Sequence, residues 1–488
     1  MERVVNVTGA CGMAIRICRS ELRGECGFAT TRLVVLAAIV TALAGTDPAR
    51  AQAPAPHSVS PSKRFKVRDE FRHCVVARFH GQYGGKTALI LPDGQLGTTD
   101  QLIPTDDPFQ PLTADQLQTV LAEGPFAKFL LLKTDHYLIF YQSTLAFAQD
   151  SGRLLEDLYR GLIDTFHRNG IPVHESEFPL VAVIFATEHD FRGHKQVDPQ
   201  VRAYYEFFTN RIFFFQKSDH DQLEPKVAAL LKPQTVAHEG AHQILSNIGV
   251  QPRLSSWPPW LVEGLAEYCA TTVNSKKGIT WNGVAAINSL HMATIRELED
   301  PLSNQINGAL VPAIQVARQR SIMQAESLML KSVLTPTDYA QAWAFTHYLA
   351  QRRGTDFVKL LKAMGQVPPL QPRTPQENLA EFRKFFDGDL ARLDKKVDDY
   401  VHKLSTKKTY DSLFYYTVIF QQTLGNGVVR RATVSQSPQY IQQWVQEQTL
   451  PQGDVPDWEA IPKPTKAQAI FAAEEWMRAM LGQPPQRF

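Results

Sequence analysis

A histidine pair with a carboxylate beside it lies near the middle of the sequence, in the segment Thr235-Val-Ala-His-Glu-Gly-Ala-His-Gln-Ile-Leu245. His238 and His242 are four residues apart, so on an α-helix both imidazoles leave the same face, with Cβ atoms about 5–6 Å apart. Two ring nitrogens can then share one metal ion, and Glu239 could take a proton from a water bound to that ion. The segment therefore predicts a catalytic metal site.

A third ligand is needed, because catalytic zinc usually takes three protein ligands and leaves one position to water. The candidates lie in Trp260-Leu-Val-Glu-Gly-Leu-Ala-Glu-Tyr-Cys269, where Glu263 and Glu267 are four residues apart. We expect Glu263 to bind the metal and Glu267 to accept a hydrogen bond from a ligating histidine, which would orient that ring. The reverse assignment of the two carboxylates is the alternative.

The helices that carry these residues have their own sequence signals. Apolar residues recur at helical spacing around the two histidines and predict that one side of this helix is buried: Val236, Ala237, Ala241, Ile244, Leu245 and Ile248. Before Trp260, the run Trp257-Pro-Pro predicts a helix start with Pro259 near the first turn. A buried helix would hold its ligands still.

The two motifs together resemble the gluzincin metallopeptidases. His-Glu-x-x-His-Gln, followed about twenty residues later by Trp-Leu-x-Glu-Gly-Leu-Ala, is similar to the aminopeptidase-N type, whose glutamate before glycine is the third zinc ligand. The resemblance implies that His238, His242 and Glu263 bind Zn²⁺ and that Glu239 is the general base. One departure is Gly240, where a bulkier residue is commoner in that family, and a glycine inside a helix costs about 0.5–1 kcal/mol relative to alanine.

Four further segments resemble the peptidase-MA-like domain of uncharacterised exported bacterial proteins, over about residues 130–365. They are Tyr137-Leu-Ile-Phe-Tyr, Leu158-Tyr-Arg-Gly, Glu177-Phe-Pro-Leu-Val-Ala-Val and Tyr339-Ala-Gln-Ala-Trp-Ala. The resemblance implies an α+β fold, with a gluzincin-like mixed sheet and active-site helices followed by a mostly helical lobe. It also implies that the strand Arg211–Phe215 lies near the edge strand along which an extended peptide adds its backbone; an ordinary core strand is the alternative.

The composition indicates a globular protein without a strong charge. The 488 residues are 44% hydrophobic and 20% charged, and the formal net charge is +2. That length is sufficient for two or more domains. The near-neutral balance gives no reason to expect a nucleic acid or an anionic lipid surface as partner.

The N-terminal residues have the pattern of an export signal. Arg32 precedes a twelve-residue apolar run from Leu33 to Ala44, and small residues suited to cleavage follow at Ala51 and Ala53. We expect residues 1–53 to be a signal peptide and the protein to be exported; an uncleaved membrane anchor is the alternative. The mature chain would keep only Cys74 and Cys269, either as a disulfide or as a free thiol and a buried small hydrophobe.

The rest of the chain divides by pattern into four regions. Residues 54–125 predict a β-rich N-terminal module after a Pro-rich linker, and 126–275 predict a peptidase N-lobe of strands and helices that includes the metal-binding helices. Residues 276–405 are expected to be a helical C-lobe. Residues 406–488 predict a C-terminal extension, with a hairpin at Gly425-Asn426-Gly427 and a last amphipathic helix.

Related enzymes often use a tyrosine or histidine from a downstream helix to hydrogen-bond the tetrahedral oxyanion. Thr335-Pro-Thr-Asp338 predicts the start of such a helix, and Tyr339 is our first candidate with His347 as the second. The alternative for both is an ordinary core or surface position. Three other histidines, His189, His194 and His291, are isolated in the sequence and are expected to be structural.

The sequence therefore predicts an exported zinc-dependent metallopeptidase that acts on a peptide or protein substrate through a metal-activated water. The alternative is a catalytically silent, zinc-containing binding or scaffold protein of the cell envelope. The presence of Glu239 favours the peptidase, because a structural zinc site has no use for a general base. Neither the substrate nor the oligomeric state follows from the residues.

Overall fold

The computed structural model describes residues 63–68, 74–83, 86–99, 102–198, 201–218, 225–275, 278–299, 323–386, 388–405, 414–425 and 427–480. They contain several sheets and many helices, so the predicted α+β class is confirmed. The export signal predicted for residues 1–53, and the linker after it, lie outside these ranges. Among the described helices, none combines the length and the apolar character that crossing a bilayer requires.

The chain forms two compact units. One comprises the described parts of residues 1–257, 272–284 and 357–378, and the other comprises those of residues 258–271, 285–356 and 379–488.

The first unit begins with an antiparallel sheet, which confirms the predicted β-rich N-terminal region. Its strand order is β4-β3-β2-β1-β5, and its strands are β1 (Arg64–Arg68), β2 (Cys74–Tyr83), β3 (Lys86–Ile90), β4 (Leu96–Thr99) and β5 (Ile103–Thr105). The turn between β3 and β4 contains Gly94 at φ 81°, a backbone conformation that glycine adopts without steric cost. The core of this sheet includes Phe178, Phe208 and Leu370, so the sheet packs directly on the rest of the unit.

A second, mixed sheet forms the centre of the unit, with the order β6-β7-β8-β10-β9. Its strands are β6 (Leu130–Lys133), β7 (Tyr137–Tyr141), β8 (Leu180–Thr187), β9 (Ala203–Glu206) and β10 (Arg211–Lys217). The inner strands β7, β8 and β10 are parallel, and the edge strands β6 and β9 are antiparallel to their neighbours. The Arg211–Phe215 segment is therefore an inner, buried strand that lies directly beside the edge strand β9.

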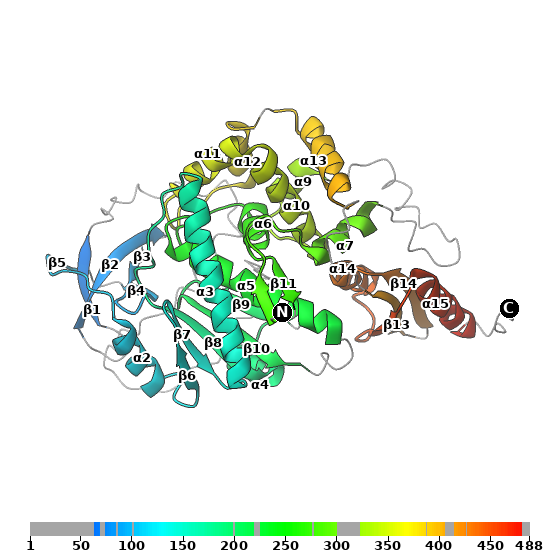
Figure 1. Cartoon of the computed structure of the whole chain (residues 1–488), viewed down its shortest axis with the longest axis horizontal. Coiled ribbons are helices and arrows are strands. Elements are labelled where there is room, and N and C mark those ends of the chain that lie inside the picture. Colours follow the sequence, from blue (N-terminus) through cyan, green and yellow to red (C-terminus); the bar gives the residue numbers. More distant parts are fainter. Residues whose placement is uncertain are drawn as a thin grey trace. The chain divides into compact units, whose positions relative to one another are not determined.

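Helices cover both faces of this sheet because side chains along each strand alternate between them. One face packs against α2 (Ala114–Glu123) and α4 (Glu188–His194) through a core that includes Phe140, Val183 and Phe213. The helices α3 (Leu145–Arg168) and α5 (Pro225–Asn247) belong to the same unit and pack on one another. Figure 1 shows α3 as a long helix, which packs against β7.

Gly240 lies where α5 meets α3. A Cβ at this position would lie 2.5 Å from Leu155 Cδ2 and 3.2 Å from Leu158 Cδ2, both on α3. Because both leucines are fully buried, a larger side chain would force the helices apart or the leucines into other rotamers. The departure from the gluzincin pattern at this position thus has a packing cause.

The second unit is mainly helical in its first part. It contains α6 (Pro259–Cys269), α7 (Ser289–Glu299), α9 (Ala325–Leu330), α10 (Pro336–Arg352) and α13 (Leu390–Ser405). Val284, Ile287, Leu290 and Leu298 recur at a spacing that predicts one helix, but α7 begins only at Ser289. Ala285 has φ 71°, which a helix excludes, and Asn288 Oδ1 accepts from the backbone N–H groups of Leu290 and His291.

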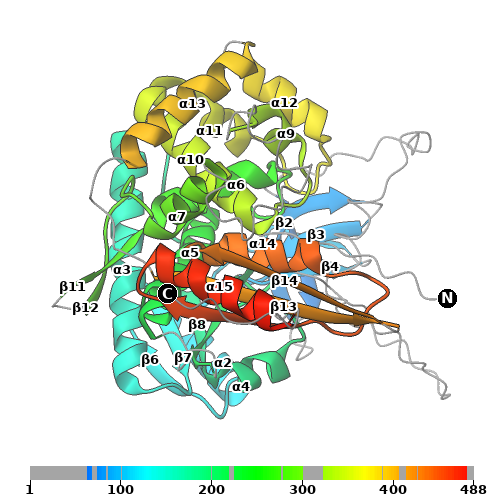
Figure 2. The ribbon, with the colours of Figure 1, turned by 90° about the vertical axis from the view of Figure 1, so that its right-hand side faces the viewer.

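The last described residues form a small sheet with the order β14-β13-β15. The predicted hairpin is confirmed, since β13 (Tyr415–Leu424) pairs antiparallel with β14 (Gly427–Ser435). The third strand is β15 (Asp457–Lys463), and the two helices are α14 (Pro438–Gln448) and α15 (Lys466–Met480). Figure 2 shows α15 lying along β13 and β14, where Ala469 and Ala473 pack on Val434. The remaining elements are α11 (Gly354–Gly365), α12 (Pro375–Arg383), β11 (Thr272–Ser275) and β12 (Gly278–Trp281).

Within the second unit, α6 packs closely on α10 at Gly264. A Cβ on Gly264 would lie 2.5 Å from the Ala342 carbonyl oxygen, and nearer still to Thr346 Oγ1. We predict that Gly264→Ala destabilises the protein by about 1–3 kcal/mol, because backbone cannot move aside as a side chain can. The measurement is the free energy of unfolding in urea.

The matched control is Gly193→Ala in α4, where nothing lies within 4 Å of the added methyl. That substitution should be neutral or stabilising by up to about 1 kcal/mol, because alanine is the better helix former. Equal stabilities for the two variants would mean that α6 and α10 are not in close contact at Gly264.

Candidate metal centre

His238, Glu239 and His242 lie in the C-terminal half of α5 and are all buried. The apolar residues predicted to surround them are buried as well, including Ala237, Ala241 and Leu245. A helix fixed on this side by packing has little freedom to rotate. The two imidazoles are therefore held in one orientation relative to the sheet.

Glu263 lies in α6, which begins as predicted with Pro258 at the N-cap and Pro259 in the first turn. The helix is anchored by Trp260, whose ring lies 5.1 Å from that of Phe345 and 5.9 Å from that of Phe382 between centroids. Glu263 itself is 2% exposed. Burying a carboxylate so completely is unfavourable unless it is paired or binds a metal.

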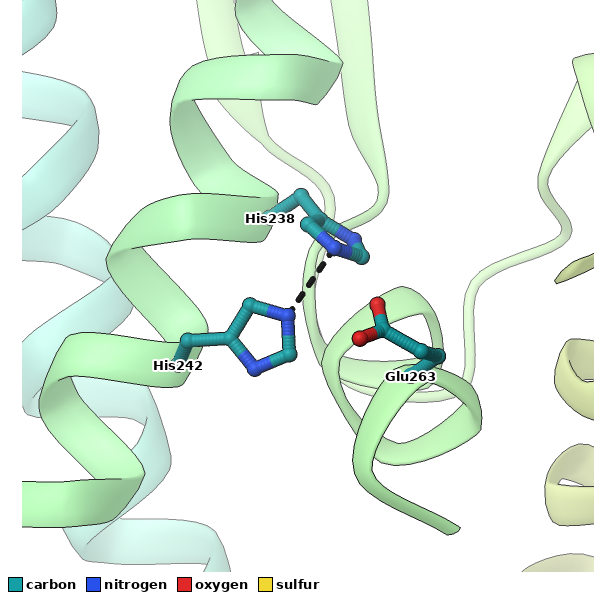
Figure 3. A group of neighbouring side chains, drawn as sticks. All are labelled: His238, His242 and Glu263. Atoms are coloured by element: carbon teal, nitrogen blue, oxygen red, sulfur yellow. Dashed lines mark hydrogen bonds between the residues drawn. The ribbon is translucent and has the colours of Figure 1, made fainter. Parts of the chain in front are cut away.

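His238, His242 and Glu263 come together as one group in the structure. Each offers a ligand atom, and these atoms all lie within 4.8 Å of one another. Figure 3 shows both imidazoles and the carboxylate turned toward a common point. The Nε2 atoms of His238 and His242 are 3.0 Å apart. Within the described residues, this is the one group of histidine, cysteine and acidic side chains suited to holding a metal ion.

The donor set fits a zinc ion. Zinc takes imidazole nitrogen and carboxylate oxygen at about 2.0–2.2 Å, and two such ligands in a tetrahedral arrangement lie about 3.3 Å apart. The 3.0 Å separation of the two Nε2 atoms is close to that spacing. In the protonation states that metal ligands require, two neutral imidazoles and an ionised carboxylate, the group would have one negative charge, which a divalent cation would offset in a buried site.

Glu239 also contacts the edge of the central sheet. Its Oε2 atom accepts a hydrogen bond of 2.7 Å from the backbone N–H of Tyr205 in β9. Glu239 is 1% exposed, so little water competes with the Tyr205 N–H for this carboxylate oxygen. The edge strand of the sheet thus contacts the residue predicted to be the general base.

Two further polar residues of α5 continue this attachment at helical spacing. Gln243 Nε2 donates to the carbonyl oxygens of Val181 (3.1 Å) and Asn210 (2.7 Å). Asn247 and Asn210 exchange hydrogen bonds between their side-chain amides, at 2.8 and 2.9 Å. Glu239, Gln243 and Asn247 therefore form a polar ladder, one residue per turn, that binds α5 to the sheet.

Glu267 is buried in α6, one turn after Glu263. Its Oε2 atom lies 2.8 Å from His291 Nε2 and accepts from Asn288 Nδ2 at 3.4 Å. His291, which we expected to be structural, is thus a neighbour of a predicted site residue. The hydrogen bond expected between Glu267 and a ligating histidine stays a prediction.

The two oxyanion candidates differ in their surroundings. Tyr339 lies in the first turn of α10 and is half-buried. His347 is buried, its Nδ1 accepts from Tyr400 Oη at 2.8 Å, and its Nε2 donates to the Ala285 carbonyl at 3.0 Å. Burial lowers the pKa of His347 and favours its neutral form. Both of its ring nitrogens are engaged, which argues against an oxyanion role for His347.

The predicted alternatives for the two cysteines can be distinguished. Cys269 is buried at the end of α6 and Cys74 is exposed at the start of β2, and the two are not joined in a disulfide. Burial raises the pKa of the Cys269 thiol, which keeps it protonated. Cys269 therefore fills space as a small hydrophobe.

Comparison with known proteins adds one match. A family model described as a protein of unknown function (DUF1570) matches residues 232–371, a segment that contains His238, His242, Glu263 and Tyr339. The family is uncharacterised, and the match is not to a peptidase family. No curated protein matches the chain.

The polar ladder leads to a stability prediction. We expect Gln243→Leu to destabilise the protein by about 1–3 kcal/mol, because it removes the donor from two buried carbonyl groups while keeping the side-chain volume. Gln376→Leu is the control, since Gln376 is an exposed helical glutamine in α12. That change should stay within about 0.5 kcal/mol in the same urea unfolding experiment. A neutral Gln243→Leu would mean that the ladder does not hold α5.

Proposed function

We propose that this protein is an exported zinc-dependent metallopeptidase that hydrolyses peptide bonds. The observation that supports this best is the buried group of His238, His242 and Glu263, with Glu239 next to the first ligand on the same helix. Three protein ligands are what catalytic zinc sites usually provide. The family match is compatible with this proposal but does not name an activity.

In this proposal, His238, His242 and Glu263 hold the ion. When bound, zinc lowers the pKa of a coordinated water toward about 7 and polarises a carbonyl oxygen. The carboxylate of Glu239 takes the proton from the attacking water as the new C–O bond forms. Glu239 then delivers that proton to the amide nitrogen as the C–N bond breaks. Tyr339 is proposed to donate a hydrogen bond to the tetrahedral oxyanion.

The surroundings of Glu239 suit such a role. The side chain is buried, so a proton that it takes up does not exchange with bulk water before it is delivered. One of its oxygens accepts from the Tyr205 N–H, which fixes the orientation of the carboxylate. A general base must lie within hydrogen-bond distance of the proton that it takes. A carboxylate whose orientation is already fixed loses less entropy when it adopts that position.

The competing proposal is a zinc-containing but catalytically silent binding or scaffold protein. A purely structural zinc site fills four positions from the protein and has no need of a buried glutamate beside its ligands. The group in the described residues has three members, so the peptidase is the better supported of the two. Both proposals assume export, which rests on the apolar run between Leu33 and Ala44.

Metal content tests the ligand assignment. We expect about one zinc per chain by elemental analysis of the protein beginning near residue 54. Glu263→Ala should lose most of the zinc after dialysis against a chelator, because it removes one of three ligands. Glu267→Ala should keep it. Zinc lost from Glu267→Ala and kept by Glu263→Ala would reverse the two carboxylates, and a folded wild type that binds no zinc would end the peptidase proposal.

Turnover tests the general base. On a cleaved substrate found in a peptide library, Glu239→Gln should lower kcat by about 10²–10⁴-fold, because the amide cannot accept the proton. Its zinc content should equal that of the wild type. A Glu239→Gln variant with full activity would rule out this mechanism, and a zinc-loaded wild type that cleaves no peptide would favour the silent alternative.

A further inference from the structure

Strand β9 is an edge of the central sheet, so alternate backbone groups point away from its neighbour β10. Tyr205 pairs with Ile212 in this ladder. Its N–H donates to the Glu239 carboxylate in α5, so it belongs to the outward-facing set. By the alternation of an antiparallel pair, the N–H groups of Tyr204 and Glu206 face β10 instead.

The side chain of Tyr205 is fixed independently of its N–H. Its hydroxyl donates to Asn210 Oδ1 at 2.9 Å, and Asn210 in turn bonds Asn247 of α5. Asn210 lies in the turn between β9 and β10 at φ 59°, a left-handed conformation that asparagine tolerates better than most residues. The polar ladder therefore binds both ends of the β9–β10 turn to the metal-binding helix.

The N-terminal sheet holds the same turn from another direction. The backbone N–H of Leu96 donates to the Phe208 carbonyl at 2.7 Å. Arg253 Nη1 donates to the carbonyls of Gly94 (2.8 Å) and Phe207 (3.2 Å). Arg253 is buried, and burial lowers the pKa of its guanidinium. Its hydrogen bonds to the two carbonyl groups therefore offset the cost of removing a cation from water. The end of β9 is thus fixed by partners on two sides.

We propose that Tyr205 is a positioning residue of the metal centre, because its outward backbone N–H holds the Glu239 carboxylate in its working orientation. The β9–β10 turn, fixed by Asn210 and Arg253, sets where that N–H lies. The hydrogen bond is a property of the fold, and only its consequence for turnover depends on the proposed peptidase function. The N-terminal sheet then acts as a support for the general base.

Amide hydrogen exchange tests the bond without any substrate. We compare wild type, Glu239→Ala and Glu239→Gln by mass spectrometry with electron-transfer fragmentation, which resolves single amides. In Glu239→Ala the Tyr205 amide should exchange about 10–100-fold faster, because it loses its acceptor. Glu239→Gln retains a carbonyl oxygen and should restore most of the protection. The amides of Tyr204 and Glu206 report on β9 itself and should not change.

Two outcomes would overturn the proposal. If the Tyr205 amide exchanges equally in all three proteins, Glu239 is not its acceptor. If Tyr204 and Glu206 lose protection together with Tyr205 in Glu239→Ala, the substitution has loosened the whole strand and Tyr205 has no specific role. Neither outcome depends on whether the protein cleaves peptides.

The effect on turnover is tested by removing the N–H itself. Proline has no N–H and is tolerated at edge strands where that group points outward. Tyr205→Ala and Tyr205→Pro both lose the ring and its hydrogen bond to Asn210, and only Tyr205→Pro also loses the N–H. Tyr205→Pro should therefore have a kcat about 10-fold or more below that of Tyr205→Ala at equal zinc content, because Glu239 loses its fixed orientation. Equal kcat values for the two variants would contradict the proposal.

Discussion

The attachment of α5 to the edge of the central sheet is the constraint on which the candidate site depends. Glu239, Gln243 and Asn247 follow one another at a spacing of four residues, and each bonds the sheet or its β9–β10 turn. His238 and His242 have the same spacing but are shifted by one residue, about 100° around the helix. Fixing one row of side chains therefore fixes the direction of the other.

In each unit, the helix that carries site residues approaches a neighbouring helix closely, which limits how far its side chains can move. Gly240 lets α5 approach α3 against Leu155, and Gly264 lets α6 approach α10 against the Ala342 carbonyl. Both glycines directly follow a glutamate of the candidate site in the sequence. A helix-interior glycine costs stability by itself, so its presence beside Glu239 and Glu263 indicates that tight packing at the site outweighs that cost.

The local patterns predicted the elements well. Helical spacing identified α5, the proline pair located the start of α6, and the predicted hairpin between β13 and β14 forms. The predicted start of α7 was too early, because no residue type in Val284–Asn288 indicates the positive φ of Ala285.

The grouping of His238, His242 and Glu263 followed from spacing combined with the gluzincin resemblance. The partners of Glu239 and Glu267 could not be predicted, because Tyr205 and His291 lie 34 and 24 residues away and meet them only through tertiary packing. Only the repeat of polar residues at 239, 243 and 247 was a visible signal of the ladder.

The central claim, that two histidines of α5 and one glutamate of α6 hold a single zinc ion, is tested most directly by X-ray absorption at the zinc edge of the purified protein. The account predicts a first shell of nitrogen and oxygen only, at about 2.0–2.2 Å, with the outer-shell scattering of two imidazoles. A sulfur ligand at about 2.3 Å, or the signature of fewer than two imidazoles, would contradict it.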